Sequence, residues 1–415
     1  MKTIKLQIII TCLLLTFLIS CGTKKQIKTV KIPEDFAGMV HAGHTKTAEE
    51  YEFIDEMGIS WILTTFNWSS VEKQQGVWDF SSYDAYVEAA KQHNKKIIVV
   101  LGYQTGWIFP DGNSRKYISA ENIPHFVEFV ERTVTRYKTK VDAWQVWNEP
   151  NFARFWKGTK AEYLELTKAA SAKIKELDPD AMLLMGGFNL IGYNAYLKGL
   201  FKSGAMQIGG DFSFHPYNLN ANWTTNCYKT LLKRLDKKNF TGNVVVTEVG
   251  YPTGGWYPNA ISEKKLGSYI VKTMTLLAVN GVRVACWYQL FDPDKEKRAK
   301  RNSEDYFGLA FRNFEKKQGA AAYPACVKNI AGKTYDPSFY KKTKIPCGIK
   351  NFYFEGDDGS KTLIMWKKTF GTKKLKLSIS GNEFMMFDVK TEKTISININ
   401  EKLKITKSPV IITWR

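Results

Sequence analysis

Residues 141–148, VDAWQVWN, form an apolar run, and residues 160–177, KAEYLELTKAASAKIKEL, follow it with apolar side chains at helical spacing. This pairing occurs eight times between residues 36 and 330. Many of the runs are continuous rather than alternating, which is typical of parallel strands covered on both faces. Eight strands, each followed by a helix, predict an α/β protein with a (β/α)8 TIM barrel. We expect the strands at residues 36–42, 61–66, 97–103, 141–148, 181–186, 211–215, 244–249 and 282–289, and the helices at 47–57, 81–94, 123–137, 160–177, 191–201, 227–238, 262–280 and 320–330.

The pattern changes near Gly348, after which short strand-like segments are separated by turn sequences such as Asp357-Asp358-Gly359. Because no helical pattern lies between them, this region predicts a small C-terminal antiparallel β-sandwich. We therefore expect two domains, a (β/α)8 barrel of the size of a catalytic domain over residues 34–335 and an accessory β-sandwich over residues 345–415. Trp366 is expected to point inward, so structural support is the favoured role for the sandwich.

The first twenty residues have a basic start, an apolar middle and a small-residue end, which is typical of a secretory signal. The ending Leu18-Ile19-Ser20-Cys21 is similar to a bacterial lipobox, so residues 1–20 are expected to be a lipoprotein signal peptide, with lipid on Cys21 and a tether over residues 21–33. The alternative is an anchor helix. The tether is basic, and we expect a bacterial outer-membrane lipoprotein, periplasm-facing or at the cell surface, that is monomeric.

The 415 residues contain 60 Lys and Arg against 40 Asp and Glu, a net charge of +20. Hydrophobic residues make up 44% of the chain, which excludes bulk disorder. A solvated surface facing anionic lipid or envelope polymer would explain the charge. A second possibility is that the basic loop over residues 292–305 meets an acidic polysaccharide; the export signal disfavours nucleic acid as a partner. Six cysteines are too few for a disulfide scaffold. Cys326 and Cys347 are the first pair to test for a bridge, and Cys286 is expected to be a buried thiol.

Two glutamates stand at the ends of apolar runs, Glu149 after the fourth strand and Glu248 at the end of the seventh. A charge at such a position is costly unless it is paired or used. At the mouth of an eight-stranded barrel these two side chains can converge. Two carboxyl groups about 5 Å apart suit retaining glycoside hydrolysis, in which one protonates the leaving oxygen and the other attacks the anomeric carbon.

With these residues the chain resembles the clan A glycoside hydrolases, and within them family 39 and its bacterial exopolysaccharide-hydrolase relatives. The stretches that carry the resemblance lie in order along residues 34–335: WSSVEKQQGVWDF (68–80), NEPNFARFW (148–156), FHPY (214–217), WYQLFD (287–292) and FGL (307–309). A retaining O-glycoside hydrolase acting on a β-linked oligo- or polysaccharide is the activity that this resemblance implies.

The resemblance also implies roles for single residues. Glu149 would be the acid/base and Glu248 the nucleophile, with Asn148 binding the sugar 2-hydroxyl. Tyr217 would hold Glu248 ionised and oriented, and Trp287 would form the floor beneath the sugar being cleaved. Many clan relatives carry an Arg near the end of the second strand, where this chain has Thr64-Thr65-Phe66-Asn67. His41 is a candidate to replace it.

Other candidates for substrate binding come from position alone. Aromatic side chains in loops at the barrel mouth can stack on sugar rings, and the set we propose for substrate contact, with the histidine of the FHPY stretch added, is Trp107, Trp156, His215 and Trp256. The five histidines show no metal-binding spacing, so neither a metal nor a cofactor is expected. Two alternatives stay open, a transglycosylase that remodels envelope glycan and a non-catalytic glycan-binding lipoprotein on a hydrolase barrel.

Overall fold

The structure is a computed structural model that describes residues 28–40, 47–109, 116–189, 193–208, 210–339, 343 and 345–415. The predicted export signal, Cys21 and His41 lie outside these residues. Within these ranges, no helix combines the length and apolarity that a membrane span needs.

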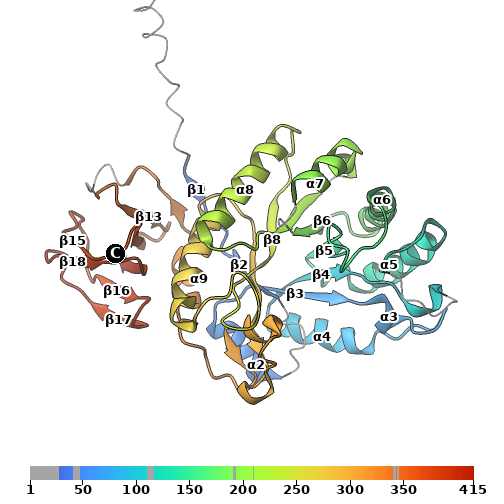
Figure 1. The fold of residues 1–415 in the computed structure, drawn as a ribbon, viewed down its shortest axis with the longest axis horizontal. Coiled ribbons are helices and arrows are strands. Elements are labelled where there is room, and N and C mark those ends of the chain that lie inside the picture. The colour runs from blue at the N-terminus through green and yellow to red at the C-terminus, as the bar shows by residue number, and fades with distance from the viewer. Residues whose placement is uncertain are drawn as a thin grey trace, which may run out of the picture.

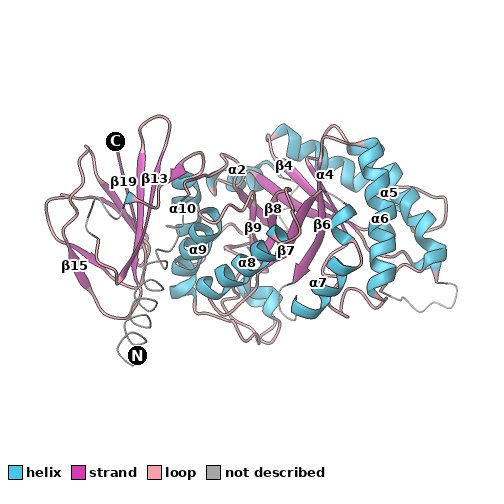
Figure 2. Ribbon diagram, turned by 90° about the horizontal axis from the view of Figure 1, so that it is seen from above, coloured by secondary structure: helices cyan, strands magenta, loops and turns pink. Residues whose placement is uncertain are grey.

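Eight parallel strands close into a barrel, as predicted, with helices around it (Figures 1 and 2). The strands are β2 (Ala37–Val40), β3 (Trp61–Phe66), β4 (Lys96–Leu101), β5 (Ala143–Val146), β6 (Met182–Asn189), β7 (Asp211–His215), β8 (Val244–Val249) and β9 (Ala285–Trp287). The main helices are α2 (Ala48–Glu56), α4 (Ser81–Gln92), α5 (Ile123–Tyr137), α6 (Lys160–Leu177), α7 (Tyr193–Lys202), α8 (Ala221–Asp236), α9 (Glu263–Ala278) and α10 (Ala322–Ile330), and a single turn, α3 (Trp68–Val71), follows β3. Helix α8 begins six residues before its predicted start, because the Asn220 side chain accepts hydrogen bonds from two backbone N–H groups of its first turn.

Alternating strand residues divide between two hydrophobic layers. In β3, Trp61 and Leu63 belong to the cluster that fills the barrel interior, whereas Ile62 packs into the layer between strands and helices. The alternation continues in β4, where Ile98 and Val100 point to the interior. Both faces of each strand are therefore buried, which is why the strands appear as continuous apolar runs in the sequence.

The C-terminal region is a seven-stranded sheet with the strand order β1-β12-β13-β14-β19-β16-β17, faced by the pair β15-β18. Its strands are β13 (Ile349–Glu355), β14 (Lys361–Lys367), β15 (Lys373–Leu375), β16 (Met385–Asp388), β17 (Lys393–Ser396), β18 (Leu403–Ile405) and β19 (Val410–Trp414). Two edge strands come from elsewhere in the chain: β1 (Val30–Lys31) lies in the predicted tether, and β12 (Thr334–Tyr335) lies at the end of the predicted barrel.

The middle of the large sheet is buried on both faces, whereas its edge strand β17 is exposed. In β14, Leu363 and Met365 pack toward the β15-β18 pair, and Ile364 and Trp366 pack into the barrel's hydrophobic core beside α9 and α10. Figure 2 shows the sheet standing against these two helices. The sandwich is thus joined to the barrel by a shared core.

The cysteine pair singled out from the sequence is not bridged. Cys326 is buried on α10, Cys347 is exposed, and all four cysteines among the described residues are free. The Cys326 thiol instead lies 3.7 Å from the Thr275 hydroxyl on α9. Cys286 is a buried thiol, as expected.

Candidate active site

Glu149 and Glu248 meet at the carboxyl-terminal mouth of the barrel. Glu149 lies three residues after the end of β5, and Glu248 is the second-last residue of β8. One oxygen of each carboxylate and one nitrogen of His215 all lie within 4.8 Å of one another. Carboxyl groups about 5 Å apart suit nucleophilic attack by one of them, because that spacing leaves no room for a water molecule between carboxylate and sugar.

Two donors fix the Glu149 carboxyl group. Asn189 Nδ2 donates to Oε1 at 2.8 Å, and His215 Nδ1 lies 2.7 Å from the same oxygen. The other ring nitrogen, Nε2, lies 3.1 Å from the Thr247 hydroxyl, which can donate to a neutral ring or accept from a charged one. Because both donors address Oε1, a proton carried by Glu149 lies on Oε2, where it can be given to a leaving group.

Glu248 is held by Tyr217 and lies close to His215. The Tyr217 hydroxyl donates to Oε2 at 3.0 Å, and His215 Nδ1 lies 3.4 Å from that oxygen. Burial raises the pKa of Glu248 to about 7; the charges of Glu149 and Glu304 add to this, and the charge of His215 and the Tyr217 hydrogen bond oppose it. Burial lowers the pKa of His215, but Glu248 and Glu149 outweigh it and leave the pKa above its ordinary value. The pKa of Glu248 and the pKa of His215 therefore each depend on the charge of the other group.

The backbone that carries Glu149 is strained. Trp147 has φ +66° and Glu149 has φ +45°, in the left-handed region that residues with a Cβ rarely adopt. Gly187, at φ +52° in a bulge of β6, accepts the Glu149 N–H at 3.2 Å. A Cβ on Gly187 would lie 2.6 Å from Gln145 Nε2. Glycine at this position therefore lets the two backbones approach closely.

A buried polar network supports this turn from inside the barrel. Gln145 Nε2 donates to the Trp147 carbonyl at 2.9 Å, and Ser213 Oγ donates to Gln145 Oε1 at 2.8 Å. Ser213 also accepts the N–H of Gly187 at 2.6 Å. Three adjacent strands thus hold the turn in the geometry that presents Glu149 to the mouth.

Two of the aromatic residues expected to contact substrate are buried. Trp287 is 0% exposed and Trp156 is 3% exposed, so neither presents a ring face to a ligand in this structure. Trp287 packs on Tyr251, and the Trp156 indole N–H donates to the Thr159 carbonyl at 3.0 Å. The expected substrate contacts of both residues are corrected on this ground.

The remaining candidates lie nearer the surface. Trp256 is 84% exposed, whereas Trp107 is partly buried against Trp68. Asn148 hydrogen-bonds to the Tyr103 hydroxyl beside the carboxylate pair. His215 is fully buried, so it acts on the carboxylates rather than standing open to substrate.

Several residues of the site carry no motif signal. Asn189, which holds Glu149, could have been found only as a polar residue ending the apolar run of β6. Gln145, Ser213 and Thr247 are polar residues inside strands, a weak sign of a buried network. Glu304, in the loop after β9, accepts the Tyr288 hydroxyl at 2.8 Å, and no sequence pattern connects it to the catalytic pair.

Glu149, His215 and Glu248 also present the only cluster of three potential metal ligands found among the described residues. Two carboxylates and an imidazole are chemically able to bind a divalent cation. Such an ion would keep both carboxylates ionised and leave no proton for a leaving group, so proton transfer and cation binding are competing uses of this site.

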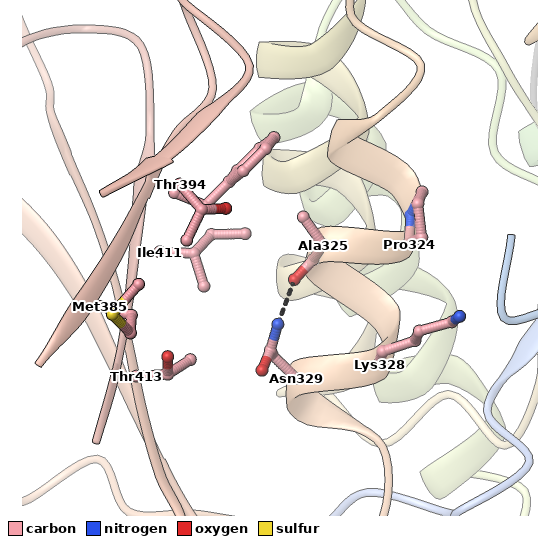
Figure 3. A pocket seen from close by; sticks show the side chains of 9 residues that line it. Pro324, Ala325, Lys328, Asn329, Met385, Thr394, Ile411 and Thr413 are labelled. Carbon is pink, nitrogen blue, oxygen red and sulfur yellow. Dashed lines mark hydrogen bonds between the residues drawn. The ribbon is translucent and has the colours of Figure 1, made fainter. Parts of the chain in front are cut away.

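A separate cavity of about 260 Å³ lies between α10 and the sheet strands β16, β17 and β19 (Figure 3). Its lining includes Pro324, Lys328 and Asn329 from the helix and Met385 and Thr413 from the sheet. It belongs to the contact between barrel and sandwich.

Comparison with known proteins gives three findings. The sequence model of glycosyl hydrolases family 39 matches residues 68–228, and no curated protein matches the chain in sequence. Solved structures similar to the chain include a family 39 glycoside hydrolase from the gut symbiont Bacteroides cellulosilyticus WH2, with a TM-score of 0.77, 20% identity and coverage of 92% of this chain and 81% of that one.

Two further structures show the same architecture. A family 39 β-xylosidase from Caulobacter crescentus has a TM-score of 0.68 and 15% identity, covering 94% of this chain and 98% of that chain. The catalytic domain of a family 30 xylanase C from Talaromyces cellulolyticus has a TM-score of 0.62 and 11% identity, covering 93% of this chain and 98% of that one. The solved structures show the fold, and the family model matches the part of the chain that contains Glu149 and His215.

Proposed function

We propose that this chain, a family 39-like glycoside hydrolase of the retaining clan A type, cleaves a β-linked oligo- or polysaccharide with Glu248 as nucleophile and Glu149 as acid/base. The observation that carries the assignment of these two residues is the spacing of their oxygens, within 4.8 Å, together with their different partners. Tyr217 donates to Glu248, which favours an ionised carboxylate, and both donors to Glu149 leave Oε2 open to carry a proton.

The reaction would take two displacements. In the first, Glu248 attacks the anomeric carbon, the glycosidic C–O bond breaks, and the proton of Glu149 passes to the leaving oxygen. In the second, Glu149 takes a proton from water, whose oxygen attacks the same carbon and releases Glu248. His215 contacts both carboxylates, so a protonated ring can stabilise the negative charge on whichever of the two is ionised.

The substrate is proposed to be a polymer or oligosaccharide because aromatic side chains are exposed in loops around the mouth. Trp256 is 84% exposed and Tyr257 is 38% exposed in the loop after β8, and Trp223 at the start of α8 is 55% exposed. Flat aromatic faces bind the C–H faces of sugars with little loss of rotamer entropy. The N-terminal sequence further supports a lipid-anchored enzyme of the bacterial envelope, and this location rests on residues 1–21 alone.

The test is turnover on a panel of plant, fungal and bacterial polysaccharides, with product sizing and with NMR of the first-formed anomer. Glu149→Ala should lose most activity on poor leaving groups and regain it with added azide as a product of retained configuration. Glu248→Ala should lose activity on every substrate. An inverted product, or full turnover by Glu248→Ala, would overturn the assignment.

A further inference from the structure

Two exposed arginines lie in loops that follow strands on opposite sides of the barrel. Arg154 lies in the loop after β5 and Arg301 in the loop after β9, and these are the fourth and eighth strands of the closed eight-stranded barrel. Loops four strands apart face each other across the mouth of such a barrel. A chain that bridges these two loops passes over the carboxylates of Glu149 and Glu248.

Both arginines are exposed, and among the described residues neither forms an ion pair with a carboxylate. Three other cations of the loop after β9, Lys295, Lys297 and Arg298, do form ion pairs. Lys295 pairs with Glu315 at 2.5 Å, and Lys297 pairs with Asp294 at 2.7 Å. Among the described residues, Lys300 and Arg301 are the cations of this loop that form no ion pair, and Arg301 is the one that lies against an exposed aromatic ring, that of Trp256.

Arg154 lies beside aromatic side chains that neighbour the catalytic pair. Its guanidinium stacks on Phe155, with 5.5 Å to the ring centroid, and Phe155 stacks on Tyr103 at 6.3 Å. Burial raises the pKa of Tyr103 and of Tyr257, and the charge of Arg154 opposes this at both phenols although they lie in loops after different strands. The negative charge of Glu149 also raises the pKa of both phenols. The Arg154 guanidinium and the Glu149 carboxylate therefore act on the same two tyrosines.

Arg301 is combined with an exposed aromatic face. Its guanidinium lies 6.0 Å from the ring of Trp256, which is 84% exposed. The neighbouring Tyr257 contacts Phe307, and Phe307 contacts Tyr217, the donor to the nucleophile. A sugar stacked on Trp256 would place a ring substituent beside the guanidinium, whose planar fork matches a carboxylate.

The centre of the mouth has the opposite sign. Glu149 and Glu248 lie there with Glu304, whose negative charge raises the pKa of Glu248 and which accepts the Tyr288 hydroxyl. An acidic sugar at the point of cleavage would face three carboxyl groups, and like charges at this distance are unfavourable. Acidic sugars on either side of that point would instead meet Arg154 and Arg301.

We propose that the natural substrate is an anionic β-linked glycan in which a neutral sugar occupies the cleavage point and carboxylate-bearing sugars bind at Arg154 on one side and Arg301 on the other. This inference rests on the proposed glycoside hydrolase function and adds the substrate class. It assigns both arginines to specificity rather than to the chemical step.

The test compares polymers that differ only in charge. Uronate-containing β-glycans, namely glucuronoxylan, gellan and hyaluronan, are each assayed beside their carboxyl-reduced forms. Binding is measured by affinity electrophoresis with Glu248→Gln, so the result does not depend on turnover, and KM is measured for every polymer that wild type cleaves. The variants are Arg154→Gln and Arg301→Gln, and Lys297→Gln is the matched control in the same loop.

At least one acidic polymer should retard the protein more than its reduced form, and added salt should abolish the difference because these exposed charges are screened. Each arginine variant should weaken binding, or raise KM, roughly threefold to fivefold on the acidic form only, with kcat and aryl-glycoside hydrolysis unchanged. Lys297→Gln should behave as wild type. Equal retardation by all acidic and reduced forms would overturn the inference even if wild type hydrolyses glycosides, whereas failure of the aryl-glycoside and azide assays would overturn the proposed function itself.

Discussion

Replacing Tyr217 by Phe should change how the rate of this enzyme depends on pH. The Tyr217 hydroxyl donates to Glu248 Oε2 at 3.0 Å in a site where the pKa of Glu248 is about 7. A hydrogen bond to a charged group contributes about 1.5 to 3 kcal/mol, and one pKa unit corresponds to about 1.4 kcal/mol. Removing the hydroxyl destabilises the ionised form, so the pKa of Glu248 should rise by about one to two units.

The sign of the effect follows from the need for an ionised nucleophile. Below its pKa, Glu248 is mostly protonated, and each added unit of pKa removes a factor of about ten from the reactive fraction. The kcat/KM of Tyr217→Phe at pH 6 should therefore fall roughly tenfold to a hundredfold, and the loss should shrink as the pH rises above 8.

The assay is the pH profile of kcat/KM on a dinitrophenyl glycoside, whose leaving group needs no proton from Glu149. Tyr251→Phe is the matched control because its hydroxyl lies 3.1 Å from that of Thr224 and touches neither carboxylate. Its profile should keep the wild-type acidic limb. A uniform loss for Tyr217→Phe at every pH, with the acidic limb unmoved, would refute the proposed action of this hydroxyl on Glu248.

Three further predictions concern stability. Ser213→Ala leaves the Gly187 N–H and Gln145 Oε1 unsatisfied and should cost about 1 to 3 kcal/mol in urea unfolding; an effect no larger than that of the exposed Thr230→Ala would contradict a supporting network. The fold raises the pKa of Glu248 from 4.5 to about 7, so the stability that its protonated form contributes is present below pH 4.5 and is lost as the pH rises to 7. Across that window the free energy of unfolding of Glu248→Gln should therefore increase by up to about 3 kcal/mol relative to wild type. A stability difference that does not change with pH would contradict this prediction. Lys317 and Asp292 form a fully buried ion pair, and Lys317→Met leaves the Asp292 carboxylate with Arg298, at 3.8 Å, as its remaining cationic partner. The variant should cost about 3 to 5 kcal/mol, with part of the loss recovered when Asp292→Asn is added; no recovery would show that the pair is not the cause.

The barrel could be predicted because its signal is local. Each strand is an apolar run buried on both faces and each helix has one apolar side, so burial determines the pattern that the sequence shows. The site was predictable to the extent that parallel strands end at one mouth, which placed Glu149 and Glu248 together. The strands β1 and β12 escaped prediction because two-residue edge strands carry no period and depend on a partner far along the chain.

Side-chain depth was the main source of error at the site. A tryptophan at the end of a barrel strand can line the mouth or pack below it, and Trp287 packs below it on Tyr251. Trp156 lies in a loop, yet Trp147 and Tyr163 enclose it. His215 contacts both carboxylates from a third strand, and such a three-way meeting depends on barrel geometry that no spacing in the sequence encodes.

The most direct test of the account is covalent trapping of the nucleophile. A 2-deoxy-2-fluoro glycoside with a good leaving group, matched to the sugar found in the polysaccharide panel, should inactivate the enzyme and add one glycosyl mass to the peptide containing Glu248. Attachment at any other residue, or steady turnover without a covalent adduct and with an inverted product, would contradict the assignment of the two carboxylates.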